Sequence, residues 1–181
     1  MPPRPPSDSQ MELPLRLSLR YNPLFLELGR HLNKETWGVL QGGQIQGTVT
    51  NRKDIKELLA LFCYLFGIPE QEHINEQDSV FHAVFRYPSF AIQFIFTLVP
   101  NVSLHPTLWG SLSLYPHQVI ELRFGTDNFI AFAPRESEVC HMALPEGRSE
   151  QYRALDLEQG AKVLPGKLER AVDDYIKSLS L

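Results

Sequence analysis

The fold of this chain is decided by residues 80–97, VFHAVFRYPSFAIQFIFT. Large apolar side chains alternate with other residues on both sides of Pro88-Ser89, which is the period of two strands joined by a tight turn. If Tyr87 faces Phe90 across this turn, one face of the pair is continuously apolar. That face consists of Phe81, Ala83, Phe85, Tyr87, Phe90, Ile92, Phe94 and Phe96. We predict an antiparallel hairpin with this face in the core.

The opposite face of the same hairpin is mixed in character. It carries His82, Arg86, Gln93 and Thr97 between smaller apolar residues. The second face of an antiparallel sheet commonly meets solvent or a partner, but a polar face can also line a pocket. We therefore predict that these four side chains belong to an interface or to a binding site.

Other segments predict the remaining elements. Residues 13–19 alternate like a strand, and Gly42-Gly43 predicts a hairpin within residues 37–50 in which Leu40 faces Ile45. Apolar stripes at helical spacing predict helices near residues 23–32, 51–66 and 168–179. Further strands are expected at residues 108–115, 119–124, 129–133 and, more weakly, 139–144.

This order of elements predicts an α+β fold. We expect a mostly antiparallel sheet of about six or more strands, with two internal helices and a C-terminal amphipathic helix packed on it. Residues 1–10 have four prolines and no apolar periodicity, which predicts a disordered tail. Residues 11–181 are then a single domain, because 43% apolar residues in a chain of this length suffice for one core.

Composition excludes several classes of function. Seventeen Lys and Arg against 21 Asp and Glu give a net charge of −4, which argues against sequence-specific nucleic-acid binding through bulk charge. No segment is apolar enough for a signal peptide or a membrane span, although peripheral membrane contact is left open. Only Cys63 and Cys140 are present, as is usual in a reducing compartment. We expect an intracellular, cytoplasmic protein.

No motif in the chain points to catalysis, a metal or a cofactor. The six histidines lack HxH or HExxH spacing, and Cys140-His141 would point to opposite faces of a strand. The glycines of residues 38–47 lack the order of a phosphate-binding loop. We therefore expect no enzyme activity, no metal and no cofactor.

The N-terminal tail contains one motif with a binding mechanism. Pro2, Pro3, Arg4, Pro5 and Pro6 have overlapping PxxP spacing, and such a segment can present a polyproline helix to an aromatic groove. These five residues are the predicted partner-binding site.

The element order resembles that of rhabdovirus matrix proteins over residues 11–124. The resemblance rests on the strand ELPLRLSLR, the helix DIKELLALFCYLFG and the segment TLWGSLSLYPHQVIELRF, and no late-domain motif accompanies it. It implies a virion protein that self-associates and bridges a nucleocapsid to the inner face of an envelope.

Two functions follow from these observations. The first is a non-catalytic interaction or assembly protein that self-associates or binds a protein partner. The alternative is a small-molecule-binding domain of helix-grip type, with a pocket under the C-terminal helix that the four polar residues of the hairpin line.

Overall fold

The structure is a computed structural model that describes residues 23–100, 107–116, 118–125, 130–135, 141–143 and 166–181. The predicted tail and the predicted strand at residues 13–19 lie outside these ranges, so the domain boundaries stay a prediction. The helices are α2 (Pro23–Asn33), α3 (Arg52–Phe66) and α5 (Lys167–Ser178). The strands are β1 (Val39–Val49), β2 (Gln71–Gln77), β3 (Val80–Arg86), β4 (Ala91–Leu98), β5 (Thr107–Tyr115), β6 (Gln118–Gly125), β7 (Ile130–Pro134) and β8 (His141–Ala143).

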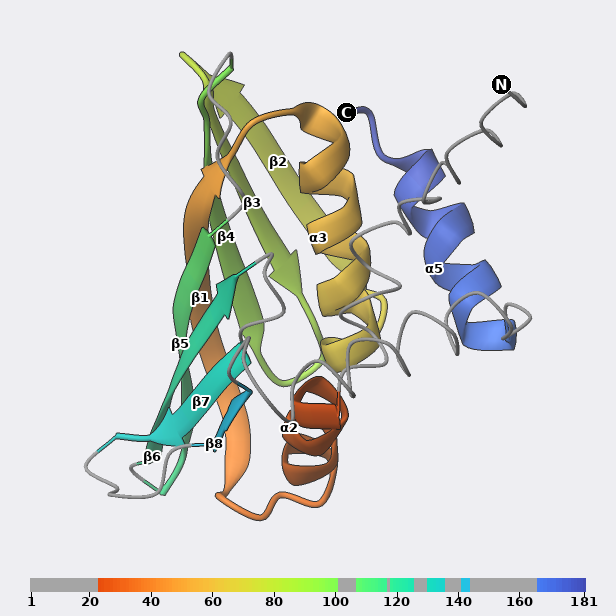
Figure 1. Ribbon diagram of the computed structural model, residues 1–181. Helices are drawn as coiled ribbons and strands as arrows, with labels where there is room; N and C mark the ends of the chain where they lie inside the picture. Colours follow the sequence, from red (N-terminus) through yellow and green to blue (C-terminus); the bar gives the residue numbers. More distant parts are fainter. Residues whose placement is uncertain (1–22, 101–106, 117, 126–129, 136–140, 144–165) are drawn as a thin grey trace, which may run out of the picture.

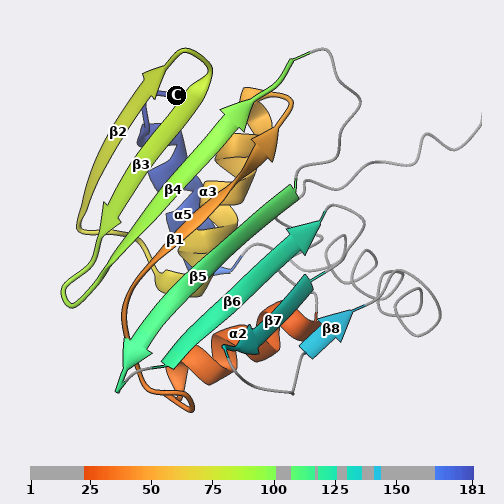
Figure 2. The same ribbon diagram turned by 90° about the vertical axis from the view of Figure 1, so that its left-hand side faces the viewer.

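The strands form one eight-stranded sheet in the order β2-β3-β4-β1-β5-β6-β7-β8. Every pair is antiparallel except β1 and β4, which run parallel because α3 and the β2–β3 hairpin lie between them in the chain. All three described helices lie on the same face of the sheet (Figure 1). The other face is uncovered by any described helix or strand, as Figure 2 shows from that side. The predicted α+β class is confirmed.

The hairpin around Pro88-Ser89 forms in the predicted register. The backbone N–H of Tyr87 donates to the carbonyl of Phe90 at 2.9 Å, and Arg86 pairs with Ala91. Seven of the eight predicted core residues are buried, and Phe90 packs partly buried against them. Aromatic rings fill this part of the core, with the centroid of Phe85 5.0 Å from that of Phe94. Alternation therefore identified the core face of β3 and β4 correctly.

The helices α3 and α5 also agree with their sequence signals. Asn51 caps α3, since its side-chain oxygen accepts from the backbone N–H of Asp54 at 2.9 Å. At the other end Gly67 adopts φ 91° and its N–H donates to the carbonyl of Cys63, a conformation that favours glycine. Helix α5 packs beside α3 and places the ring of Tyr175 against that of Phe85. Both helices thus bury one stripe and expose the other.

The predicted hairpin at Gly42-Gly43 is wrong. Residues 39–49 form the single strand β1, which lies at the centre of the sheet between β4 and β5. Here the glycines serve close packing: a Cβ on Gly43 would stand 2.5 Å from Cδ2 of Leu112 and 2.8 Å from the carbonyl oxygen of Ser111. The same pair of residues that could make a turn instead admits side chains of β5 over the strand.

The strand β2 was not predicted. Its sequence, QEHINEQ, contains one apolar residue, Ile74. Such a polar strand is tolerated here, because β2 pairs only with β3 and is an outer strand of the sheet. An ion pair holds it to the helix layer, with the guanidinium of Arg52 2.5 Å from the carboxylate of Glu76. Strand formation here depends on backbone pairing, which leaves no apolar pattern in the sequence.

The lengths of the described helices can be compared with the length that a membrane span needs. Among the residues that the structure describes, α3 is the longest helix, with 15 residues, and none of the helices qualifies as a membrane span.

Candidate functional site

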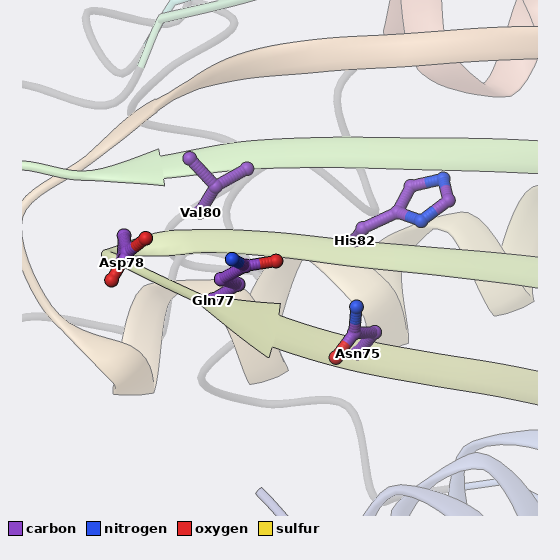
Figure 3. A pocket seen from close by; sticks show the side chains of 5 residues that line it. All are labelled: Asn75, Gln77, Asp78, Val80 and His82. Atoms are coloured by element: carbon purple, nitrogen blue, oxygen red, sulfur yellow. The ribbon is translucent and has the colours of Figure 1, made fainter.

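A hollow of about 330 Å³ lies on the uncovered face of the sheet, where the β2–β3 hairpin turns. We call it the hairpin hollow, and Figure 3 shows the five side chains that line it. Asn75 and Gln77 come from β2, Asp78 from the turn, and Val80 and His82 from β3. Its volume is at the small end of the range of ligand pockets.

The backbone pairing of β2 and β3 brings these side chains together. Asn75 pairs directly with His82, and Gln77 with Val80, so all four point to the same face. Between them, Asp78 and Ser79 form a two-residue turn with positive φ values of 47° and 68°. The turn is tied to the sheet, because the N–H of Leu98 donates to the carbonyl of Ser79 at 2.7 Å. The Asp78 carboxylate therefore has a defined place at the rim.

The imidazole of His82 is held from the neighbouring strand. Nε2 of the Gln93 amide lies 2.7 Å from Nε2 of His82. An amide nitrogen only donates, so the ring nitrogen accepts and the imidazole carries its proton on Nδ1. This orients the ring and leaves its Nδ1–H as a donor. The hollow thus offers amide, carboxylate and imidazole groups beside one apolar side chain.

The structure places all four predicted polar residues on the uncovered face, but only His82 lines the hollow. Gln93 contacts His82, Thr97 is exposed across from Val80, and Arg86 is exposed at the far end of β3. The face, and with it the hollow, is opposite to α5, whereas the pocket was predicted beneath that helix. The predicted partner-binding residues Pro2, Pro3, Arg4, Pro5 and Pro6 lie outside the described residues.

Four of the five hollow residues were not predicted as site residues: Val80 and the three polar residues Asn75, Gln77 and Asp78. The three polar residues belong to β2 or to the turn that follows it, and the polar sequence of β2 does not predict a strand. The one available signal was the pair Asp78-Ser79, since Asp and Ser favour turns and an alternating strand follows at Val80.

The buried titratable groups on the helix side are structural. Cys63 is fully buried in α3, and burial raises the pKa of its thiol to about 12, which makes it unreactive. Burial likewise raises the pKa of Tyr87 and of Tyr175. Among the described residues, no three His, Cys, Asp or Glu side chains gather in a way that could hold a metal.

Comparison with known proteins finds a likeness in the fold. No protein-family model matches the chain, and no curated protein is significantly similar to it. Among solved structures, an oxidoreductase from Thermotoga maritima has a TM-score of 0.55 at 12% identity and covers 90% of this chain. A dehydrogenase (MviM) from Clostridium difficile has a TM-score of 0.53 at 10% identity, again over 90% of the chain. The chain therefore shares its fold with these proteins.

These neighbours overturn four predictions. The resemblance to rhabdovirus matrix proteins is wrong, and with it the virion location. The non-catalytic assembly function and the expected absence of an enzyme are overturned as well, since the fold belongs to proteins named as enzymes. The alternative of small-molecule binding agrees better with them. Element order misled because a sheet with helices on one face is common to many unrelated proteins.

The chain is shorter than the proteins it resembles. It spans 56% of the length of the Thermotoga maritima protein and 61% of the length of the Clostridium difficile one. A further neighbour, which bears the name of an NADPH-dependent oxidoreductase from Desulfitobacterium hafniense, has a TM-score of 0.55 at 7% identity; the match covers 90% of this chain and 57% of that one. The likeness therefore concerns little more than half of each neighbour.

Proposed function

We propose that this chain is the small-molecule-binding part of an oxidoreductase-type enzyme and that it binds a small hydroxyl- or carbonyl-bearing molecule in the hairpin hollow. The observation that carries the proposal is the match of 90% of the chain to solved oxidoreductases. Dehydrogenases as a class act on alcohols and carbonyl compounds, because hydride transfer interconverts the two.

The chemistry of the hollow supports this class of ligand. A hydroxyl group both donates and accepts, and the amides of Asn75 and Gln77 can do the same. The carboxylate of Asp78 accepts, while the Nδ1–H of His82 donates. Val80, which is 38% exposed, offers the carbon skeleton an apolar contact. A few polar groups around an apolar patch are typical of small-molecule sites.

The described residues do not fit a nicotinamide dinucleotide. Such a site needs parallel strands and a glycine-rich turn that leads from a strand into a helix. Among the described strands only β1 and β4 are parallel, and the turn from β1 into α3 is Thr50-Asn51-Arg52, without glycine. We therefore assign to this chain only the binding of the other reactant. A cytoplasmic location is part of the proposal and is supported by the two-cysteine sequence.

A titration followed by NMR tests the proposal. Small alcohols and polyols, each with its carbonyl counterpart, are added up to about 10 mM to the ¹⁵N-labelled chain. Backbone amides of residues 75–82 are expected to shift for at least one pair. Asn75→Leu should weaken that binding at least tenfold, because it removes a donor and an acceptor from the hollow.

Gln71→Leu is the matched control. Gln71 is an amide residue on the same strand and the same sheet face as Asn75, but it lies outside the hollow. Its substitution should leave the affinity unchanged. Shifts confined to other parts of the chain, or equal losses in both variants, would contradict the assignment.

A further inference from the structure

The uncovered face of the sheet differs in composition from the helix side of the same protein. Its side chains alternate with the core residues of β2, β3, β4, β1, β5 and β6, and we call it the open face. The eight strands contain no lysine, whereas α3 and α5 carry Lys53, Lys56, Lys167 and Lys177. Amides and hydroxyls occupy the middle of the face: Gln44, Gln46, Thr48, Gln93, Ser111 and Ser113.

Large apolar side chains stand exposed on this face. Trp109 is 47% exposed near the middle of the sheet, beside Gln46 of β1 and Arg123 of β6. Tyr115, at the end of the same strand, is 60% exposed. Depletion of lysine and acidic residues together with exposed Trp and Tyr is the composition of a protein interface, not of a surface that faces water.

We propose that the open face is an interface on which a second copy of this chain packs, sheet against sheet. The dimensions agree. Six long strands about 4.8 Å apart, each about seven residues at about 3.3 Å per residue, span about 30 Å by 23 Å. That is about 700 Å² in projection for each copy, close to the roughly 800 Å² per partner of a standard stable interface.

The charges of the face favour a second copy over a partner of opposite charge. An isologous contact sets a surface against itself, so the surface must have no strong charge of one sign. The described open face carries charges of both signs: Arg86, Arg123 and Arg135 stand against Glu121, which pairs with Arg135 at 2.7 Å, and against Asp78 at the rim of the hairpin hollow. An uncovered sheet face with charges of both signs can also pack on another sheet.

The dimer needs no bound ligand to form, although the six strands of the estimated contact include β2 and β3, so a second copy would also cover the hairpin hollow. The hairpin hollow lies at the outer β2–β3 edge of the face, whereas Trp109 lies on β5, beyond β4 and β1. Dimerisation therefore tests a different property of the protein from ligand binding, and either can fail alone.

Sedimentation velocity of the full-length chain tests the inference. At about 50 µM we expect a species of twice the 20.7 kDa chain mass. Trp109→Glu places a charge at the centre of the contact and should convert the protein to the monomer mass while its far-UV circular dichroism stays unchanged. Leu168→Glu is the matched control, since Leu168 is 46% exposed on α5, and this variant should remain a dimer.

A second variant guards against misfolding of the first. Gln46→Lys puts a flexible charge beside Trp109 without removing an aromatic ring, and it should also yield monomers. A wild-type chain that stays at the monomer mass up to about 100 µM overturns the inference. So does a dimer that survives Trp109→Glu and Gln46→Lys but is lost in Leu168→Glu.

Discussion

The amide nitrogen of Gln93 lies 2.7 Å from Nε2 of His82, across the β3–β4 pair and at the edge of the hairpin hollow. Because that nitrogen can only donate, His82 should be neutral with its proton on Nδ1 when the contact is formed. Long-range ¹H–¹⁵N correlation of the imidazole at pH above 8 reports the tautomer directly. Gln93→Leu removes the donor and should shift the population toward the Nε2–H form, whereas Thr97→Val should not. A wild-type ring protonated on Nε2 would contradict the arrangement.

Tyr87 ties the β3–β4 hairpin to the end of α3. Its hydroxyl donates to the carbonyl of Gly67 at 3.1 Å, and the side chain is only 9% exposed. Tyr87→Phe should lower the free energy of unfolding by about 1–2 kcal/mol, because the carbonyl loses its partner in a largely dry site. Urea unfolding measures this loss. Tyr115→Phe, at a side chain that is 60% exposed, should change stability by less than about 0.5 kcal/mol, and equal effects would disprove the role of the bond.

Burial of Cys63 predicts a loss of stability in alkali. The pKa of the thiol rises from 9.0 to about 12 on folding, so the unfolded chain releases this proton first as the pH increases. The contribution of the buried, protonated thiol to the free energy of unfolding is fully present below pH 9. The free energy of unfolding should then fall by on the order of 1.4 kcal/mol per pH unit until about pH 12. Above pH 10 the fall should steepen, since burial also raises the pKa of Tyr87 and Tyr175.

Two cysteine variants isolate this contribution in urea unfolding. Between pH 9 and 10, below the usual range of tyrosine, the slope should disappear in Cys63→Ala and persist in Cys140→Ala. Cys140 lies outside the described residues and serves as a matched loss of one thiol. The same slope in both variants would rule out Cys63 as its source.

Gly47 permits β5 to approach β1. A Cβ at this position would collide with the carbonyl oxygen of Thr107 and with Cδ2 of Leu108. Gly47→Ala should therefore destabilise the protein by about 2–3 kcal/mol, through displacement of a central strand. Gly166→Ala is the comparison, since a Cβ there would meet nothing within 4 Å, and its cost should stay below about 1 kcal/mol. Thermal unfolding of both variants is the measurement, and equal midpoints would refute the packing role.

Much of the fold was predictable because the responsible signals are local. The hairpin at Pro88-Ser89, the capped helix α3 and the stripe of α5 each carry their pattern within a few turns of chain. The failures share a cause as well. A glycine pair is compatible with both a turn and a packed strand, and β2 is specified by pairing with β3 and not by its own side chains.

Part of the candidate site could also be predicted from the sequence, and part could not. Alternation alone placed His82 and Gln93 on one polar face, and the structure joins them. Asn75, Gln77 and Asp78 come together with His82 only because β2 pairs with β3, a relationship that no spacing along the chain expresses. The likeness in fold to solved oxidoreductases was equally hidden, since sequence identity to them is only 7–12%.

By itself, then, the stretch VFHAVFRYPSFAIQFIFT determined a hairpin, its register and the face that it buries, because side-chain period and turn chemistry act between neighbours in the chain. Tertiary structure alone decided that β1 lies parallel to β4, that all three described helices cover one face, and that no described helix or strand covers the other. Those choices depend on backbone hydrogen bonds and close packing between distant segments. Neither backbone hydrogen bonds nor packing between distant segments leaves a pattern in the local sequence.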